Sequence, residues 1–266
     1  AGFGSTFAAF VSASGGASVG QYGPLVHFGA TMGSLIRRIL GSTISTDVFI
    51  GCGVAAAIAS GFNAPIAGVV FAHEAILRHF SIRAIVPISV ASISAAWFSK
   101  EFFQTETIFK LGEVDVDLIA VIPAALVSGV LFGLIAVTFM FFVRQSTKLA
   151  TSSRFSPLSL TYIAAVIVGF GGIFVPEALG LGTGVITQIF DDHFTIGFLI
   201  ILFFSKLTFT AICIGLGLFG GVFSPALLVG ASAGAFLGKS VEGILGQSVA
   251  AVMPICGMAA VASAVI

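Results

Sequence analysis

Two stretches of the chain combine glycine and proline at a spacing that suits anion binding. Residues 20–33 read GQYGPLVHFGATMG, and residues 221–234 read GVFSPALLVGASAG. Both follow the pattern G-x-x-x-P-x-x-x-x-G-A-x-x-G, with the two copies 201 residues apart. Because all five fixed positions match, including the proline, we interpret the pair as an internal repeat rather than as chance similarity between glycine-rich helices.

The chemistry of this repeated unit is that of backbone N–H groups. Pro24 and Pro225 favour the first turn of a helix, where the missing proline N–H would have no partner in any case. The residues just before each proline then present unpaired N–H groups at the positive end of a helix, which attracts anions. Two such discontinuous helices inside a membrane predict an anion pathway that needs no full buried positive charge.

The elements that position these motifs are predicted to be membrane helices. Apolar residue types make up 58% of the 266 residues, with only 11 basic and 11 acidic residues. A soluble domain carries about a quarter charged residues, so this composition excludes one. The zero net charge excludes nucleic acid as an electrostatic partner. The apolar runs are continuous rather than alternating, so we predict an all-α, polytopic protein of the lipid bilayer.

The charge-free runs are uneven, which predicts tilted and interrupted helices. A membrane span needs about 20 apolar residues. Residues 1–36 and 207–238 are too long for one span, whereas residues 193–205 are too short. Lys206, between the last two runs, requires a partner or a water-filled cavity.

The charges of the loops predict the orientation in the membrane. Basic residues dominate 74–83 and 144–154, so we place these segments in the cytoplasm. Acidic residues dominate 100–117 and 177–192, so we place these outside.

A second echo divides the chain into two halves. Residues 53–60, GVAAAIAS, are repeated as GMAAVASA in residues 257–264, 204 residues apart. Because both echoes recur in the same order, we predict one membrane half over residues 1–117 and another over residues 118–266.

These motifs resemble those of the CLC family of chloride channels and proton-coupled chloride exchangers. Residues 20–24, GQYGP, resemble the family's G-[KR]-E-G-P motif, and residues 221–225, GVFSP, resemble its G-x-F-x-P motif. Residues 62–68, FNAPIAG, match the signature F-N-A-P-[IL]-A-G. The resemblance implies an inverted-repeat fold with tilted and discontinuous helices. It also implies a homodimer that transports chloride or another small anion and uses no cofactor.

The resemblance also implies which residues bind the anion. Backbone N–H groups of Gln21, Tyr22 and Gly23 are expected at an outer site, and those of Val222 and Phe223 at the central site. The family supplies a serine and a tyrosine to the central site from elements before and after the region matched here. We therefore expect the chain to be a fragment without those two pore elements.

Two departures from the family pattern bear on its function. The third motif position, where most of the family has a glutamate that plugs the pore and carries the proton, is Tyr22. A phenol is neutral at neutral pH, so it cannot imitate chloride as a carboxylate does. It can still donate a hydrogen bond, block sterically or merely pack against its surroundings. The second glutamate of the exchangers, which follows the residue matching Glu74, is Ala75 here.

The residues beside Ala75 leave an alternative proton route. Glu74 and His73 are candidates for it. We favour instead an ion pair between Glu74 and Arg78, four residues on. The segment from His73 to His79 lacks the spacing of a zinc protease motif, because position 77 is leucine, so we predict no metal site.

The sequence thus predicts a passive, uncoupled anion channel with Tyr22 as its gate. The alternatives are a chloride–proton exchanger that uses Glu74 or another route, and a non-conducting scaffold or anion sensor. An enzyme is not expected, because no nucleophile–base pair or metal site has the required spacing.

Overall fold

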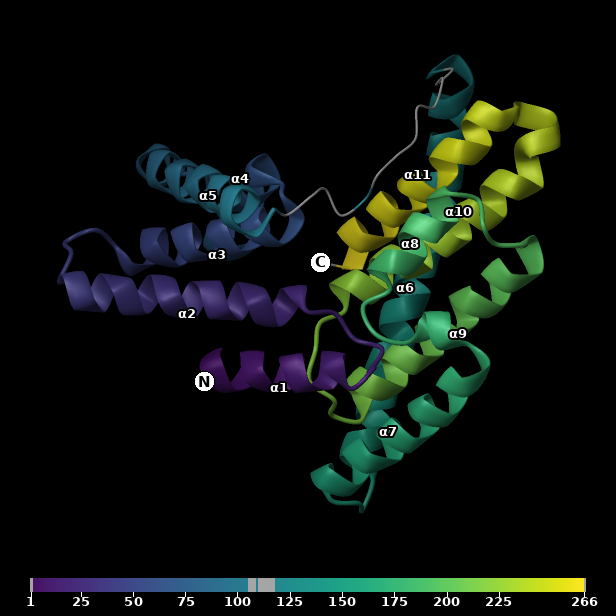
Figure 1. Ribbon diagram of the computed structural model, residues 1–266, viewed down its shortest axis with the longest axis horizontal. Coiled ribbons are helices and arrows are strands. Elements are labelled where there is room, and N and C mark those ends of the chain that lie inside the picture. Colours follow the sequence, from purple (N-terminus) through teal and green to yellow (C-terminus); the bar gives the residue numbers. More distant parts are fainter. Residues whose placement is uncertain (1, 105–108, 110–117, 266) are drawn as a thin grey trace. The chain divides into compact units, whose positions relative to one another are not determined.

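The computed structural model describes residues 2–104, 109 and 118–265 of the chain (Figure 1). Within these residues the regular structure is helical, apart from one isolated β-bridge. The predicted all-α fold is therefore confirmed. Most of the charges assigned to the outer loop 100–117 belong to residues that lie outside the described ones.

The chain forms two compact units. The first unit comprises residues 1–9 and 22–108, and the second comprises residues 10–21 and 109–266. Residues 10–21, which carry the start of the first motif, thus group with the second unit. The division into two repeat halves at residue 117 stays a prediction.

The first unit is a layer of helices in which α3 packs against both α2 and α5. A short helix, α4, continues into a π-helix, η1, and α4 packs on α3 and α5. The bounds of its elements are α2 (Tyr22–Leu40), α3 (Thr46–Phe62), α4 (Pro65–Phe71), η1 (Ala72–Leu77) and α5 (Ile82–Phe103).

Glycines allow α2 and α3 to approach closely. A Cβ placed on Gly29 would collide with the carbonyl oxygen of Gly53, and a Cβ on Gly53 would collide with the carbonyl oxygen of Gly29. On the next turn, a Cβ on Gly33 would meet the carbonyl oxygen of Phe49. Only glycine permits this backbone contact, as in other small-residue interfaces between membrane helices.

The second unit contains the remaining helices. Its core lies between α6, α9, α10 and α11 and includes Phe132, Phe139, Val229 and Val261. The helix α1 (Gly2–Ser14) begins in the first unit and ends in the second. The other elements are α6 (Leu118–Ser152), α7 (Pro157–Phe174), η2 (Pro176–Ala178), α8 (Thr183–Phe190), α9 (Ile196–Gly215), α10 (Phe223–Leu245) and α11 (Gln247–Val265).

The close helix pair of the first unit recurs in the second. A Cβ on Gly230 of α10 would collide with the carbonyl oxygen of Gly257 of α11, and the reverse holds as well. Gly230 and Gly257 are the repeat counterparts of Gly29 and Gly53. The two repeated sequence segments therefore form the two helices of a close helix–helix contact, and this contact occurs once in each unit.

Six helices of the described chain are long and apolar enough to cross a membrane: α5, α6, α7, α9, α10 and α11. The protein is therefore a multi-pass membrane protein. Helix α6 has 35 residues, which extend about 50 Å at the usual rise per residue. Because this exceeds the roughly 30 Å hydrocarbon core of a bilayer, we expect α6 to be tilted.

The two over-long charge-free runs are divided at the motifs. The run 1–36 breaks at residues 15–21, between α1 and α2, and the run 207–238 breaks at residues 216–222, between α9 and α10. The prediction of interrupted helices is thus confirmed, and both interruptions place the start of a helix in an otherwise apolar segment.

Candidate anion site

The two motif glycines of the second unit contact each other directly. Gly20 N donates to Gly221 O at 2.7 Å, and Gly221 N donates to Gly20 O at 2.6 Å. These bonds form an antiparallel bridge between the loops that precede α2 and α10. The bridge uses the backbone groups of both glycines, so the N–H groups left for an anion belong to the residues that follow them.

The start of α10 presents such unpaired donors. Val222 is the N-cap residue, and its carbonyl oxygen accepts a hydrogen bond from Ala226 N at 3.0 Å. The backbone N–H groups of Val222 and Ser224 donate no hydrogen bond within the described part of the chain. Phe223 is the first helical residue, and Pro225 lies in the first turn, as the motif predicted. The positive end of a 23-residue helix therefore coincides with free donors.

The segment before the first motif is fastened at every second residue. Gly16 O accepts from Gly180 N at 3.1 Å. The Ser18 and Thr210 hydroxyls share a hydrogen bond of 3.1 Å, and Gly20 forms the bridge to Gly221. These three contacts hold residues 16–20 to the rest of the second unit.

Lys206 supports this arrangement from α9. Its Nζ is buried and donates to Gly180 O at 2.7 Å and to Ala178 O at 3.1 Å. The partners that the sequence left open are thus backbone carbonyls, and no carboxylate lies in ion-pair range of Lys206 among the described residues. Gly180 N in turn donates to Gly16 O. Lys206 is therefore linked to residues 16–20 through Gly180.

Tyr22 is the first residue of α2, in the first unit, and its side chain is buried. Its ring stacks on that of Phe62, with centroids 3.8 Å apart and an angle of 20° between the planes. A Cβ on Gly61 would lie 3.3 Å from Tyr22 Cε1, so glycine gives the ring room. Gln21 and Gly23, on either side of Tyr22, are exposed. An anion role for these three residues stays a prediction.

The FNAPIAG signature forms the joint between α3 and α4. Phe62 ends α3, and Asn63 adopts a left-handed conformation with φ of 52°. Asparagine tolerates this conformation better than most residues. Pro65 then begins α4, where its fixed φ suits the first helical position. Through Phe62, this joint holds the ring of Tyr22.

The candidate proton residues lie on the π-helix η1. His73 is buried, its Nδ1 lies 2.9 Å from Val69 O, and its Nε2 has no partner among the described residues. Glu74 is exposed and Ala75 is half-buried. The predicted pair of Glu74 and Arg78 is wrong, since no ion pair joins them within the described chain. The wider turn of a π-helix and the left-handed φ of 58° at Arg78 remove the α-helical spacing that the pair requires.

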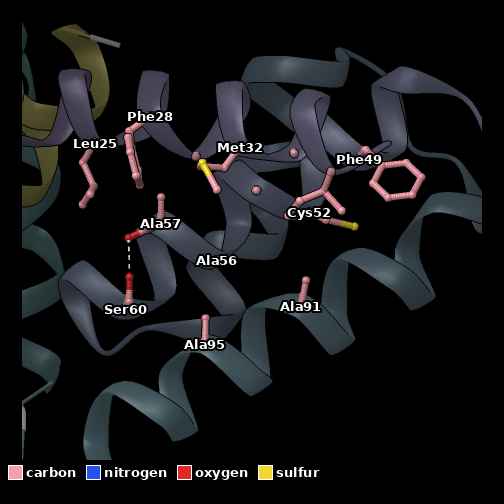
Figure 2. A pocket seen from close by; sticks show the side chains of 14 residues that line it. Leu25, Phe28, Met32, Phe49, Cys52, Ala56, Ala57, Ser60, Ala91 and Ala95 are labelled. Carbon is pink, nitrogen blue, oxygen red and sulfur yellow. Dashed lines mark hydrogen bonds between the residues drawn. The ribbon is translucent and has the colours of Figure 1, made fainter. Parts of the chain in front are cut away.

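A groove of about 490 Å³ lies in the first unit between α2, α3 and α5. Figure 2 shows that its wall consists mostly of apolar side chains, with Met32, Cys52 and Ala91 on different helices. The hydroxyl of Ser60 donates to Ala57 O at 3.2 Å, so it offers no free donor. The groove therefore lacks the polar groups that an anion requires, and it is a poor candidate for the anion site.

Two features of the site were not predicted from the sequence. The stacking partner of Tyr22 lies in another motif, so a search for contacts between motif residues would have proposed Phe62. The unpaired hydroxyl of Ser224 lies inside the second motif, at a position that the motif leaves variable. A serine at this position is the signal in the sequence that could have pointed to a further hydrogen-bond donor.

Comparison with known proteins agrees with this architecture. A family model described as "Voltage gated chloride channel" matches residues 2–266. A ClcB-like protein of Ralstonia nicotianae is 30% identical over 247 residues, which are 88% of this chain and 56% of that protein. The H(+)/Cl(-) exchange transporter ClcA of Vibrio cholerae is 26% identical over 226 residues, 81% of this chain and 48% of the transporter.

A solved structure has the same fold. The crystal structure of a CLC-type fluoride/proton antiporter aligns with 94% of this chain and 62% of its own, with a TM-score of 0.80 and 25% identity. The chain spans about half the length of the curated relatives it matches. Since the family model covers nearly all of its residues, the chain belongs to the voltage gated chloride channel family.

Proposed function

We propose that the protein conducts small anions, with chloride as the default, and that this conduction is passive and not coupled to protons. The observation that carries the proposal is the start of α10, which directly follows the bridge between Gly20 and Gly221. The unpaired N–H groups of Val222 and Ser224 supply partial positive charge at the start of α10. Binding by partial charges permits fast release, which conduction requires.

The absence of coupling rests on the residues at the two proton-carrying positions. Tyr22 replaces the first carboxylate, and Ala75 replaces the second. Glu74, beside Ala75, is exposed rather than buried on a route through the protein. Tyr22 is the proposed gate, because its ring is fixed by Phe62 at the start of α2.

A chloride–proton exchanger is the second candidate. Two of the similar proteins are described as an H(+)/Cl(-) exchange transporter and a fluoride/proton antiporter. In this chain the observation that favours it is His73, which is buried with an unpartnered Nε2 that could bind a proton. Both candidates require no cofactor and no bond chemistry, and we propose a homodimer for either.

Anion flux tests the proposal against a non-conducting scaffold. The full-length protein is reconstituted in chloride-loaded liposomes, and valinomycin is added to carry the balancing potassium. Chloride efflux well above that of protein-free liposomes is expected. Efflux equal to that of protein-free liposomes would favour the scaffold or a different ion.

A further inference from the structure

One buried hydroxyl at the start of α10 has no hydrogen-bond partner. Ser224 is 1% exposed. Its Oγ is one of three buried side-chain atoms without a partner in the described part of the chain, and the other two belong to His73 and Glu177. Buried polar groups in proteins are nearly always hydrogen-bonded, so an unpaired hydroxyl in this position requires a ligand or another explanation.

The location of Ser224 points to the motif bridge. A Cβ placed on Gly20 would lie 3.1 Å from Ser224 N and 3.2 Å from Ser224 Oγ. The backbone N–H and the hydroxyl of Ser224 therefore both lie close to Gly20, at a distance that leaves no room for a side chain on that glycine. Neither group donates a hydrogen bond to the described residues.

Another serine of the same helix shows what a structural hydroxyl does. Ser232 is also fully buried, and its Oγ donates to Val229 O at 3.0 Å, within the helix. Ser224 has no such bond, since the helix has only begun at Phe223 and Gly221 O accepts from Gly20 N. The hydroxyl is thus left unpaired at the same helix start as the N–H groups of Val222 and Ser224.

We propose that the hydroxyl of Ser224 donates a hydrogen bond to the permeating anion and is a specificity-determining residue of the pore. The inference rests on the proposed function, because it assigns a further ligand to the same anion. The unpaired groups at the start of α10 can all donate, namely the N–H groups of Val222 and Ser224 and the hydroxyl. A set of donors at the positive end of a helix suits a small anion.

The extra donor favours compact anions. The attraction between a donor dipole and an anion falls with distance, so a small anion gains more from the hydroxyl than a large one does. Chloride should therefore lose more affinity than thiocyanate when the hydroxyl is removed.

The test measures anion binding by calorimetry on the purified full-length protein in detergent. Chloride and thiocyanate are titrated into the wild type, Ser224→Ala and the matched control Ser232→Ala. Removal of a hydrogen bond to a charged group predicts roughly tenfold weaker chloride binding for Ser224→Ala. The expected loss for thiocyanate is smaller, and Ser232→Ala should bind both anions as the wild type does.

Thermal unfolding in chloride-free buffer separates a ligand from a structural residue. Because Ser224→Ala removes an unpaired buried group, its unfolding temperature should equal or exceed that of the wild type. Ser232→Ala, which loses a formed hydrogen bond, should unfold at a slightly lower temperature.

The other possible results would contradict either the role of Ser224 or the proposed anion conduction. Equal chloride affinity in Ser224→Ala and wild type would overturn the role of Ser224 and leave the proposed anion conduction intact. Weaker binding together with a lower unfolding temperature in chloride-free buffer would assign the hydroxyl a structural role instead. If the wild type conducts chloride but does not bind it at the tested concentrations, the ligand role of Ser224 is overturned. If the wild type neither conducts chloride nor binds it, the proposed function is overturned as well.

Discussion

Gly20 and Gly221 hold the same position in the two copies of the repeat, and they hydrogen-bond to each other through both backbone groups, at 2.7 and 2.6 Å. Their bridge is antiparallel. The bridge therefore joins equivalent positions of the two motif copies, and each of these positions directly precedes the start of a helix, α2 or α10.

A methyl group at this bridge should disturb it. In Gly20→Ala the new Cβ would lie 2.9 Å from Gly221 O and 3.1 Å from Ser224 N, too close for both atoms to stay in place. We expect a loss of about 1–3 kcal/mol, typical of overpacking, and a strong reduction of anion flux. Thermal unfolding and efflux measurements check this. Gly4→Ala is the control, since a Cβ there meets nothing within 4 Å, and equal behaviour of the two variants would contradict the bridge.

The glycine contact between α10 and α11 should be equally intolerant. Gly230→Ala places a Cβ against the carbonyl oxygen of Gly257, so the two helices must separate. We expect a lower unfolding temperature in detergent, with a loss of about 1–3 kcal/mol. The matched variant Gly133→Ala, on α6, meets nothing within 4 Å. It should be neutral or should gain up to about 1 kcal/mol from the higher helix propensity of alanine.

Lys206 should be needed for the position of the motif segment. Lys206→Met leaves the carbonyl oxygens of Ala178 and Gly180 without their donor, at a cost of about 1–3 kcal/mol for each buried group left unpaired. The unfolding temperature and anion flux should both fall. Lys148→Met, at an exposed position of α6, should change neither. Wild-type stability and flux in Lys206→Met would show that the link from Lys206 to Gly16 has no role.

The fold was predictable where the pattern is periodic or repeated. The apolar runs predicted membrane helices, and the motif prolines predicted where α2 and α10 begin, because the residue preferences at those positions are local. The glycine pairs were recognised as echoes, but their contact across two helices depends on packing between segments distant in sequence.

The candidate site was predictable only in part. The N–H donors before Pro225 followed from local helix chemistry. The expected ion pair of Glu74 and Arg78 is absent from the described chain because η1 is a π-helix. No residue pattern in 72–77 predicts the wider turn of this helix. Likewise, the carbonyl partners of Lys206 belong to Ala178 and Gly180. Their contact with α9 depends on tertiary packing, which the sequence of α9 alone does not predict.

A carboxylate at position 22 should restore a pH-sensitive gate. In Tyr22→Glu the ionised side chain would compete with chloride at the start of α2, and protonation would release it. Flux should therefore be low at neutral pH and rise as the pH falls. Efflux recorded at a series of pH values checks this, with Tyr22→Gln as the uncharged control of the same size. A pH dependence that is identical in both variants would place Tyr22 outside the anion path.

The most direct test of the account asks whether a chloride gradient can move protons. Full-length protein is reconstituted in liposomes with high internal chloride, at equal pH on both sides, and external chloride and pH are recorded together after valinomycin sets the voltage. Uncoupled conduction predicts chloride efflux without any change of external pH. Proton uptake in fixed proportion to chloride efflux would contradict it and would direct mutagenesis to His73 and Glu74.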